Sequence, residues 1–220
     1  MKKLTISLLI VVMSVGTSFA FGLPSLGSKS KDQSAVSIDD AMKSQSNLVA
    51  AYVAGNKYDL ETKSLIAEAL GLRDEATTLK MASESINEGN VKDIPATRAK
   101  TKDAQKAMES KMADSKDLSD DAKLKIGKSL LCLTKCVVSY KKATDLSQSA
   151  LDSAKSVVKN SSLTEVVSVK KKLDPVLTIA PKVPADLTSV VETSTKYLAF
   201  AKSAGVKPPA DLESALGGLD

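Results

Sequence analysis

Apolar residues spaced three and four positions apart dominate this chain and limit what it can fold into. The clearest stripe alternates Leu or Ile with small residues: Thr62, Leu65, Ala69, Leu72, Ala76, Leu79, Ser83 and Ile86. This spacing puts the stripe on one face of an α-helix, as in the seam of a coiled coil. No segment shows the apolar–polar alternation typical of a strand. The sequence therefore predicts an all-α, elongated antiparallel helical bundle of about five to six helices with no sheet.

Glycines and capping residues predict the boundaries of the first helices. The first helix is expected to begin at Ser37, a capping residue, and to end at Gly55, because glycine favours a helix stop. The second is expected over residues 57–88. Gly71 lies inside it, but the apolar stripe keeps its phase across this glycine, so one continuous helix is predicted.

The longest helix is expected to begin after Ser119, which can cap its first turn, and to run to about Asn160. At 1.5 Å per residue it would be about 60 Å long. Its section 130–140 is apolar on most faces, so we expect it in the middle of the bundle, covered on several sides. A weaker stripe predicts another helix before it, beginning near Asp93.

Capping residues and prolines mark the helices of the C-terminal third. Ser162 and Glu165 form the sequence pattern of a capping box. Pro175 is expected to break the helix that follows, because proline lacks a backbone N–H. Helices are predicted over residues 163–173, 185–203 and 210–216.

The first twenty residues predict export. Lys2 and Lys3 precede an apolar stretch of roughly a dozen residues, and small residues place a cleavage site between Ala20 and Phe21. A bilayer span needs about 20 apolar residues, so no transmembrane segment is expected in the mature chain. We predict a periplasmic or secreted protein. Its expected organisation is a signal peptide (1–20), a flexible leader (21–35), a helical bundle domain (36–204) and a C-terminal tail with a short helix (205–220).

Charge and aromatic content argue against nucleic-acid binding. The chain has 31 Lys and Arg against 26 Asp and Glu, and 29 basic residues remain without Lys2 and Lys3. Aromatic residues make up 3% of the chain and Trp is absent, so a stacking surface for single strands is not expected. The longest basic run, 170–172, is interpreted as a solvated helix face. Contact with anionic lipid or lipopolysaccharide is the alternative.

Histidine is absent from the chain, and this limits its chemistry. Ser-His-Asp and Cys-His systems, His-ligated zinc and a proximal-His haem are excluded. Paired acids at 39–40 and 120–121 fall at expected helix starts, where helix electrostatics explain them. Glu84 and Glu88 are interpreted as solvated. We therefore expect no catalytic residue, no cofactor and no enzyme.

Cys132 and Cys136 are the only cysteines and the weak candidates for a disulfide or a metal site. On a straight helix, Cβ atoms four residues apart are about 5–6 Å from each other, beyond the roughly 3.8 Å of a disulfide. Three alternatives stay open: buried thiols that pack as apolar groups, a strained or intermolecular disulfide, and a linear Cu(I) site. Met108 and Met112 would add thioether ligands if the two neighbouring helices formed a hairpin.

Three functions remain open on this basis. We favour an exported, non-enzymatic bundle protein that acts through contacts with another protein or the cell envelope. The predicted helices with heptad spacing are long, and the chain lacks catalytic residues. The second is a carrier or binding module for a small apolar ligand such as a lipid acyl chain, for which small seam residues would permit a slot. The third is an enzyme or a Cu(I)-binding protein. These patterns leave the oligomeric state open.

Overall fold

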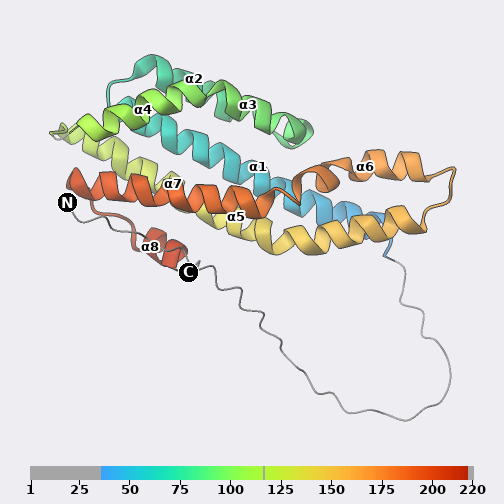
Figure 1. The fold of residues 1–220 in the computed structure, drawn as a ribbon. Coiled ribbons are helices and arrows are strands. Elements are labelled where there is room, and N and C mark those ends of the chain that lie inside the picture. The colour runs from blue at the N-terminus through green and yellow to red at the C-terminus, as the bar shows by residue number, and fades with distance from the viewer. Residues whose placement is uncertain (1–35, 116, 218–220) are drawn as a thin grey trace, which may run out of the picture. The chain divides into compact units, whose positions relative to one another are not determined.

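The computed structural model describes residues 36–115 and 117–217. This part of the chain contains eight α-helices, one 3₁₀ helix and no strand, so the prediction of an all-α helical bundle is confirmed (Figure 1). All of it belongs to one compact unit, residues 34–220. None of the helices found there is long and apolar enough to cross a bilayer. The predicted signal peptide, its cleavage site at Ala20 and Phe21, and the leader lie outside the described residues.

Two long antiparallel helices, α1 and α5, form the centre of the bundle. The elements are α1 (Ile38–Ala69), α2 (Arg73–Ser85), η1 (Glu88–Asp93), α3 (Ile94–Lys100), α4 (Lys102–Asp114), α5 (Asp120–Asn160), α6 (Val166–Ile179), α7 (Val183–Ser203) and α8 (Ala210–Gly217). Thr62 of α1 donates a hydrogen bond to the Ser129 carbonyl of α5 at 3.5 Å. The Tyr52 and Tyr140 rings meet edge to face, with centroids 5.9 Å apart. Residue numbers thus rise on α1 as they fall on α5.

Both ends of α5 agree with the prediction. Ser119 caps the helix, since its Oγ accepts a hydrogen bond from the Ala122 N–H at 3.2 Å, and the helix runs to Asn160. The section 130–140 is covered on several sides, as expected, but one of its faces is exposed. Leu131 and Val138 are 55% and 53% exposed there, because the surrounding helices pack on the other faces of α5.

The chain turns at Gly71 rather than at Gly55, contrary to the sequence prediction. Gly71 has a φ of 77°. The two N–H groups that follow Leu70 donate to the carbonyl oxygens of Glu68 and Ala67. This pattern is a Schellman motif, which ends a helix and needs a residue that adopts a positive φ without strain. The expected second helix is therefore divided, and α2 folds back along α1.

Gly55 lies inside α1, at a position where a neighbouring side chain leaves no room for a Cβ atom. A Cβ atom at this position would lie 2.7 Å from the Tyr140 ring of α5. Small residues of the predicted seam also allow close approach between helices. Ser83 of this seam donates to the Lys57 carbonyl of α1 at 3.0 Å. Ser64, which lies outside the seam, donates to the Ala76 carbonyl of α2 at 2.9 Å.

Pro175 lies inside α6, where a helix break was predicted. The Gln45 side chain of α1 fills the gap in the hydrogen-bond ladder. Its Nε2 donates to the Lys172 carbonyl at 3.0 Å, and its Oε1 accepts from the Val176 N–H at 3.2 Å. These two backbone groups would bond to each other in a regular helix. The inserted amide satisfies both, so α6 continues past the proline.

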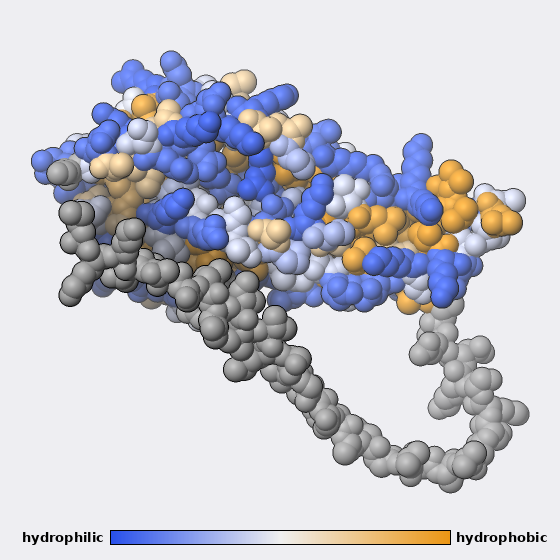
Figure 2. All heavy atoms as spheres, viewed as in Figure 1, coloured by the Kyte–Doolittle hydropathy of each residue, from blue (hydrophilic) through white to orange (hydrophobic). Residues whose placement is uncertain are grey.

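The start of α6 also differs from the prediction. Ser162 Oγ donates to the Glu165 carboxylate at 2.6 Å, but this contact belongs to the turn before the helix. No side chain caps α6, which begins at Val166. Leu163 in this turn and Val167 in the first turn of α6 are 94% and 74% exposed. Figure 2 shows apolar residues gathered at this end of the bundle, beside charged ones.

The remaining helices lie close to their predicted positions. The helix expected from Asp93 is divided at Thr101 into α3 and α4, with Pro95 in the first turn of α3. The helices predicted over 185–203 and 210–216 are α7 and α8. Leu212 of α8 is fully buried, so the short C-terminal helix packs on the bundle.

Candidate functional site

A cleft of about 720 Å³ opens between α1, the α3–α4 segment and α7. This volume is in the range of small-molecule sites. Its charged lining is Asp59 and Lys63 from α1, Arg98 and Lys102 from α3 and α4, and Lys182 and Asp186 at the start of α7. The cleft is therefore polar and draws its charges from three separate parts of the chain.

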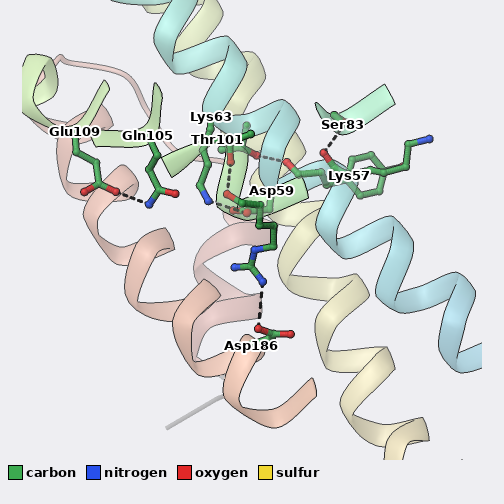
Figure 3. Close-up of polar contacts among 11 residues, drawn as sticks. Lys57, Asp59, Lys63, Ser83, Thr101, Gln105, Glu109 and Asp186 are labelled. Atoms are coloured by element: carbon green, nitrogen blue, oxygen red, sulfur yellow. Dashed lines mark hydrogen bonds and ion pairs between the residues drawn. The ribbon is translucent and has the colours of Figure 1, made fainter. Parts of the chain in front are cut away.

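Asp59 and Lys63 form a buried ion pair on the cleft wall. The Lys63 Nζ lies 2.8 Å from an Asp59 carboxylate oxygen, and the two side chains are only 4% and 6% exposed (Figure 3). Four residues separate them, which is one turn of α1. Two charges removed from water cost several kcal/mol each unless they are paired. Each residue thus depends on the other to be tolerated at this depth.

A second network joins α1, α3 and α7 through Asp186. Arg98 donates from one guanidinium nitrogen to Oδ1 of Asp186 at 3.1 Å (Figure 3). The Tyr52 hydroxyl donates to Oδ2 of the same carboxylate at 2.7 Å. Both carboxylate oxygens are occupied in this way. A guanidinium carries five N–H donors, and one of those of Arg98 makes this ion pair.

The electrostatics of the cleft keep its arginine charged and its tyrosine neutral. Burial by itself lowers the pKa of Arg98, but its interactions with Tyr140, Asp59 and Asp186 raise that pKa above the ordinary value on balance. Burial, followed by the hydrogen bond to Asp186, raises the pKa of Tyr52. The Tyr52 hydroxyl is thus a hydrogen-bond donor to Asp186. Its raised pKa disfavours the ionised, reactive form.

Positive charge exceeds negative charge in the cleft. The lining contains four cationic and two anionic side chains. Asp59 pairs with Lys63, and Asp186 pairs with Arg98. Lys102 and Lys182 lie exposed at the rim and have no ion pair among the residues that the structure describes. A cationic surplus at a concave surface attracts anions.

The interior beside Asp59 holds polar atoms with unused hydrogen-bonding capacity. Within the described ranges, four buried atoms have no protein partner: Asn56 Oδ1, Tyr140 OH, Ser194 Oγ and Tyr197 OH. Burial raises the pKa of Tyr140 and Tyr197 well above the ordinary value, and Asp59 acts on both in the same direction. Buried polar groups without partners are uncommon in folded proteins, so this interior differs from an ordinary apolar core.

Cys132 and Cys136 lie on α5 as free thiols, the first half-buried and the second buried. Burial and then Glu61 raise the pKa of Cys132 to about 11. Burial raises the pKa of Cys136 well above its usual range. Copper binds the thiolate form, and both environments favour the thiol. An intermolecular disulfide and Cu(I) binding stay predictions.

The methionines proposed as extra copper ligands are not placed on a hairpin partner of α5. The helix that carries Met108 and Met112 packs on α2 and α1 rather than mainly on α5. Met108 is fully buried. In the described part of the chain, no group of three or more Cys, Asp or Glu side chains could hold a metal ion.

The acidic pairs and the basic run lie where local electrostatics explain them. The pairs at 39–40 and 120–121 are in the first turns of α1 and α5. Glu84 is in α2 and Glu88 in η1, so the two do not share one helix face. Lysines 170–172 are exposed on α6, as the interpretation of a solvated face requires.

The sequence patterns point to none of the cleft residues as functional. The Asp59–Lys63 pair carries a local signal, because opposite charges one turn apart lie beside the apolar residues Leu60 and Ile66. The ion pair between Arg98 and Asp186 joins residues 88 positions apart, and no spacing rule links them. Comparison of the chain with protein-family models, curated proteins and solved structures finds no match.

Proposed function

We propose that the protein is an exported, non-enzymatic helical-bundle protein that binds a small molecule with an anionic group in the cleft between α1, α3–α4 and α7. The observation that carries this proposal is the cationic surplus of the cleft. Asp59 and Asp186 are already paired, and they leave Lys102 and Lys182 for a ligand at the rim. Export is inferred from residues 1–20.

The geometry of Arg98 supports an anionic ligand. The guanidinium is held by one ion pair to Asp186 and lines the cleft. Arginine binds carboxylate and phosphate groups in a two-pronged manner. Its orientation by Asp186 lowers the conformational entropy that a ligand would otherwise have to remove. Thus the cleft offers one cation oriented by an ion pair and two exposed cations.

The state of the potential nucleophiles supports binding rather than catalysis. The Tyr52 hydroxyl is engaged by Asp186, and its pKa is raised. The pKa of Cys132 is raised to about 11, whereas an activated thiol has a lowered pKa. With histidine absent from the sequence, the usual general base is missing as well.

An apolar ligand such as an acyl chain remains the alternative. The small residues of the helix seams support it, but the charged lining of the 720 Å³ cleft favours a polar ligand. The two ligand classes differ in mass and in charge. Native mass spectrometry of the protein from its own cells therefore distinguishes them, and it also gives the first residue of the processed chain.

The proposal is tested with small phosphate monoesters and carboxylates, each paired with its uncharged counterpart, in titration calorimetry. The Lys102→Gln/Lys182→Gln variant removes the two rim charges, and we expect about 3- to 10-fold weaker anion binding, as for exposed charge pairs. The control is Lys128→Gln/Lys142→Gln, which removes two exposed charges of α5. Equal effects of the two variants, or no preference for anions over neutral analogues, would overturn the cleft as the site.

A further inference from the structure

The turn between α5 and α6 exposes apolar side chains that no other described element covers. Leu163 is 94% exposed and Val167 is 74% exposed, more than any other large apolar residue of the described ranges. We call residues 161–171 the α5–α6 tip. Figure 2 shows apolar residues gathered at this end of the bundle. Scattered exposed apolar residues are ordinary, but two neighbours this fully exposed, at a protruding turn, form a surface for a partner.

The tip and its flanks are rich in lysine. Residues 161–171 carry two lysines and one glutamate, a formal charge of +1, and Lys155, Lys159 and Lys172 flank them on α5 and α6. Lys170 and Lys171 follow Val167 by three and four residues, so all three lie on one face of α6, and each is exposed. The single acid, Glu165, accepts a hydrogen bond from Ser162. The tip thus combines an apolar point with a cationic flank.

The nearest acids reduce this charge but do not cancel it. The first residues of α1 share a groove with the tip, lined among others by Ser37 and Lys172. Asp39 and Asp40 follow Ser37, and the Asp40 carboxylate accepts a hydrogen bond from the Ser37 hydroxyl at 2.6 Å. Asp174 is paired with Lys92. Against Glu165, Asp39, Asp40 and Asp152, the five lysines leave an excess of one positive charge.

We propose that the α5–α6 tip docks on a bilayer surface of anionic phospholipid. Leu163 and Val167 insert among the headgroups, and Lys170 and Lys171 lie against lipid phosphates. Basic and apolar residues together are the combination that holds a protein in the membrane interface. Charge selects this occupant over a second copy of the chain, because two tips face to face would bring lysine against lysine. The proposal does not depend on the cleft or its ligand.

Vesicle sedimentation tests the tip with the protein in the form that its cells accumulate, its first residue established by mass spectrometry. The probes are vesicles of phosphatidylcholine alone and vesicles with about a third phosphatidylglycerol, because anionic lipid supplies the attraction for lysine. We expect binding to the anionic vesicles only. Raising the salt from about 0.1 M to 1 M shortens the screening length from about 10 Å to 3 Å and should release the protein.

Matched variants separate the tip from the rest of the surface. We expect Lys170→Gln/Lys171→Gln to weaken vesicle binding about 10-fold or more, and Leu163→Ser/Val167→Ser to weaken it at least about 10-fold, through lost apolar burial. Leu131→Ser/Val138→Ser removes two half-exposed apolar residues of α5 and should leave binding unchanged. Loss of binding in the α5 variant alone, equal binding to neutral vesicles, or concentration-dependent self-association without lipid would each overturn the proposal.

Discussion

The middle of α1 buries charged side chains, whereas the α5–α6 tip exposes apolar ones. Asp59 and Lys63 are 3% and 5% exposed, and Leu163 is 94% exposed. Both regions reverse the usual distribution of polar and apolar residues, but only the first compensates for it within the protein. Each buried charge has a partner, while the apolar tip has none among the described residues. This difference indicates that the first region stabilises the fold, whereas the second is available to bind a partner.

The largest expected effect is on the buried pair. Asp59→Ala leaves Lys63 buried without its counter-ion, and we expect a loss of about 3–5 kcal/mol in the free energy of unfolding, measured by urea denaturation. Asp121→Ala is the control, because it breaks the Lys125–Asp121 pair in which the aspartate is 72% exposed. That loss should be at most about 1 kcal/mol.

A double variant decides whether the pair itself contributes net stability. Replacing a buried ion pair by apolar residues of similar size is often neutral or stabilising. We therefore expect Asp59→Leu/Lys63→Met to be far closer to wild type than Asp59→Ala. If Asp59→Ala and Asp121→Ala lost the same free energy of unfolding, the buried ion pair would not differ in stability from an exposed one.

The next effect concerns packing in the same section of α1. Gly55→Ala places a methyl group 2.7 Å from the Tyr140 ring, and we expect a loss of about 1–3 kcal/mol from overpacking. Gly71→Ala meets no atom within 4 Å and should lose about 1–2 kcal/mol through its positive φ alone. In a Tyr140→Leu background the loss from Gly55→Ala should shrink, because the clash is relieved. The loss from Gly71→Ala should stay the same, and the opposite pattern would contradict this assignment.

These two glycines show how far the sequence could predict the fold. The spacing of apolar residues predicts the helices well, and the boundaries of α5 follow from Ser119 and the stripe behind it. A break depends on contacts that are distant in sequence. Gly55 lies in an unbroken helix, and it is a glycine because Tyr140, on another helix, occupies the space that a side chain would need. Gly71 ends a helix because its carbonyl partners close a Schellman motif.

The candidate site was harder to predict than the fold. Arg98 lies on α3, and Asp186, which holds it, lies on α7. Periodicity assigns a residue to a face of its own helix, but it does not say which faces meet across the bundle. The Asp59–Lys63 pair could have been found as opposite charges on a buried stripe. The apolar tip could not, because Leu163 fits a helix pattern and its exposure depends on where α6 begins.

A smaller effect is expected at Gln45, which belongs to α1 between the two regions and supports α6. Gln45→Leu leaves the Lys172 carbonyl and the Val176 N–H without the inserted amide, and we expect a loss of about 1–2 kcal/mol in unfolding free energy. Ser46→Ala, at an exposed neighbour, should change stability by at most about 0.5 kcal/mol. Faster amide hydrogen exchange at Val176 would report the lost bond directly. Unchanged exchange there would contradict the proposed role of the amide.

The smallest effect on stability is expected at the tip itself. Leu163→Ser/Val167→Ser removes apolar groups that are already in water, so the free energy of unfolding should change by no more than about 0.5 kcal/mol. Leu173→Ser on the same helix replaces a fully buried side chain and should lose several kcal/mol, about 2–5. If the tip variant also lost kcal/mol amounts, its side chains would be packed inside the folded protein. The contrast between the two regions would then disappear, and with it the basis for assigning the tip to a membrane surface.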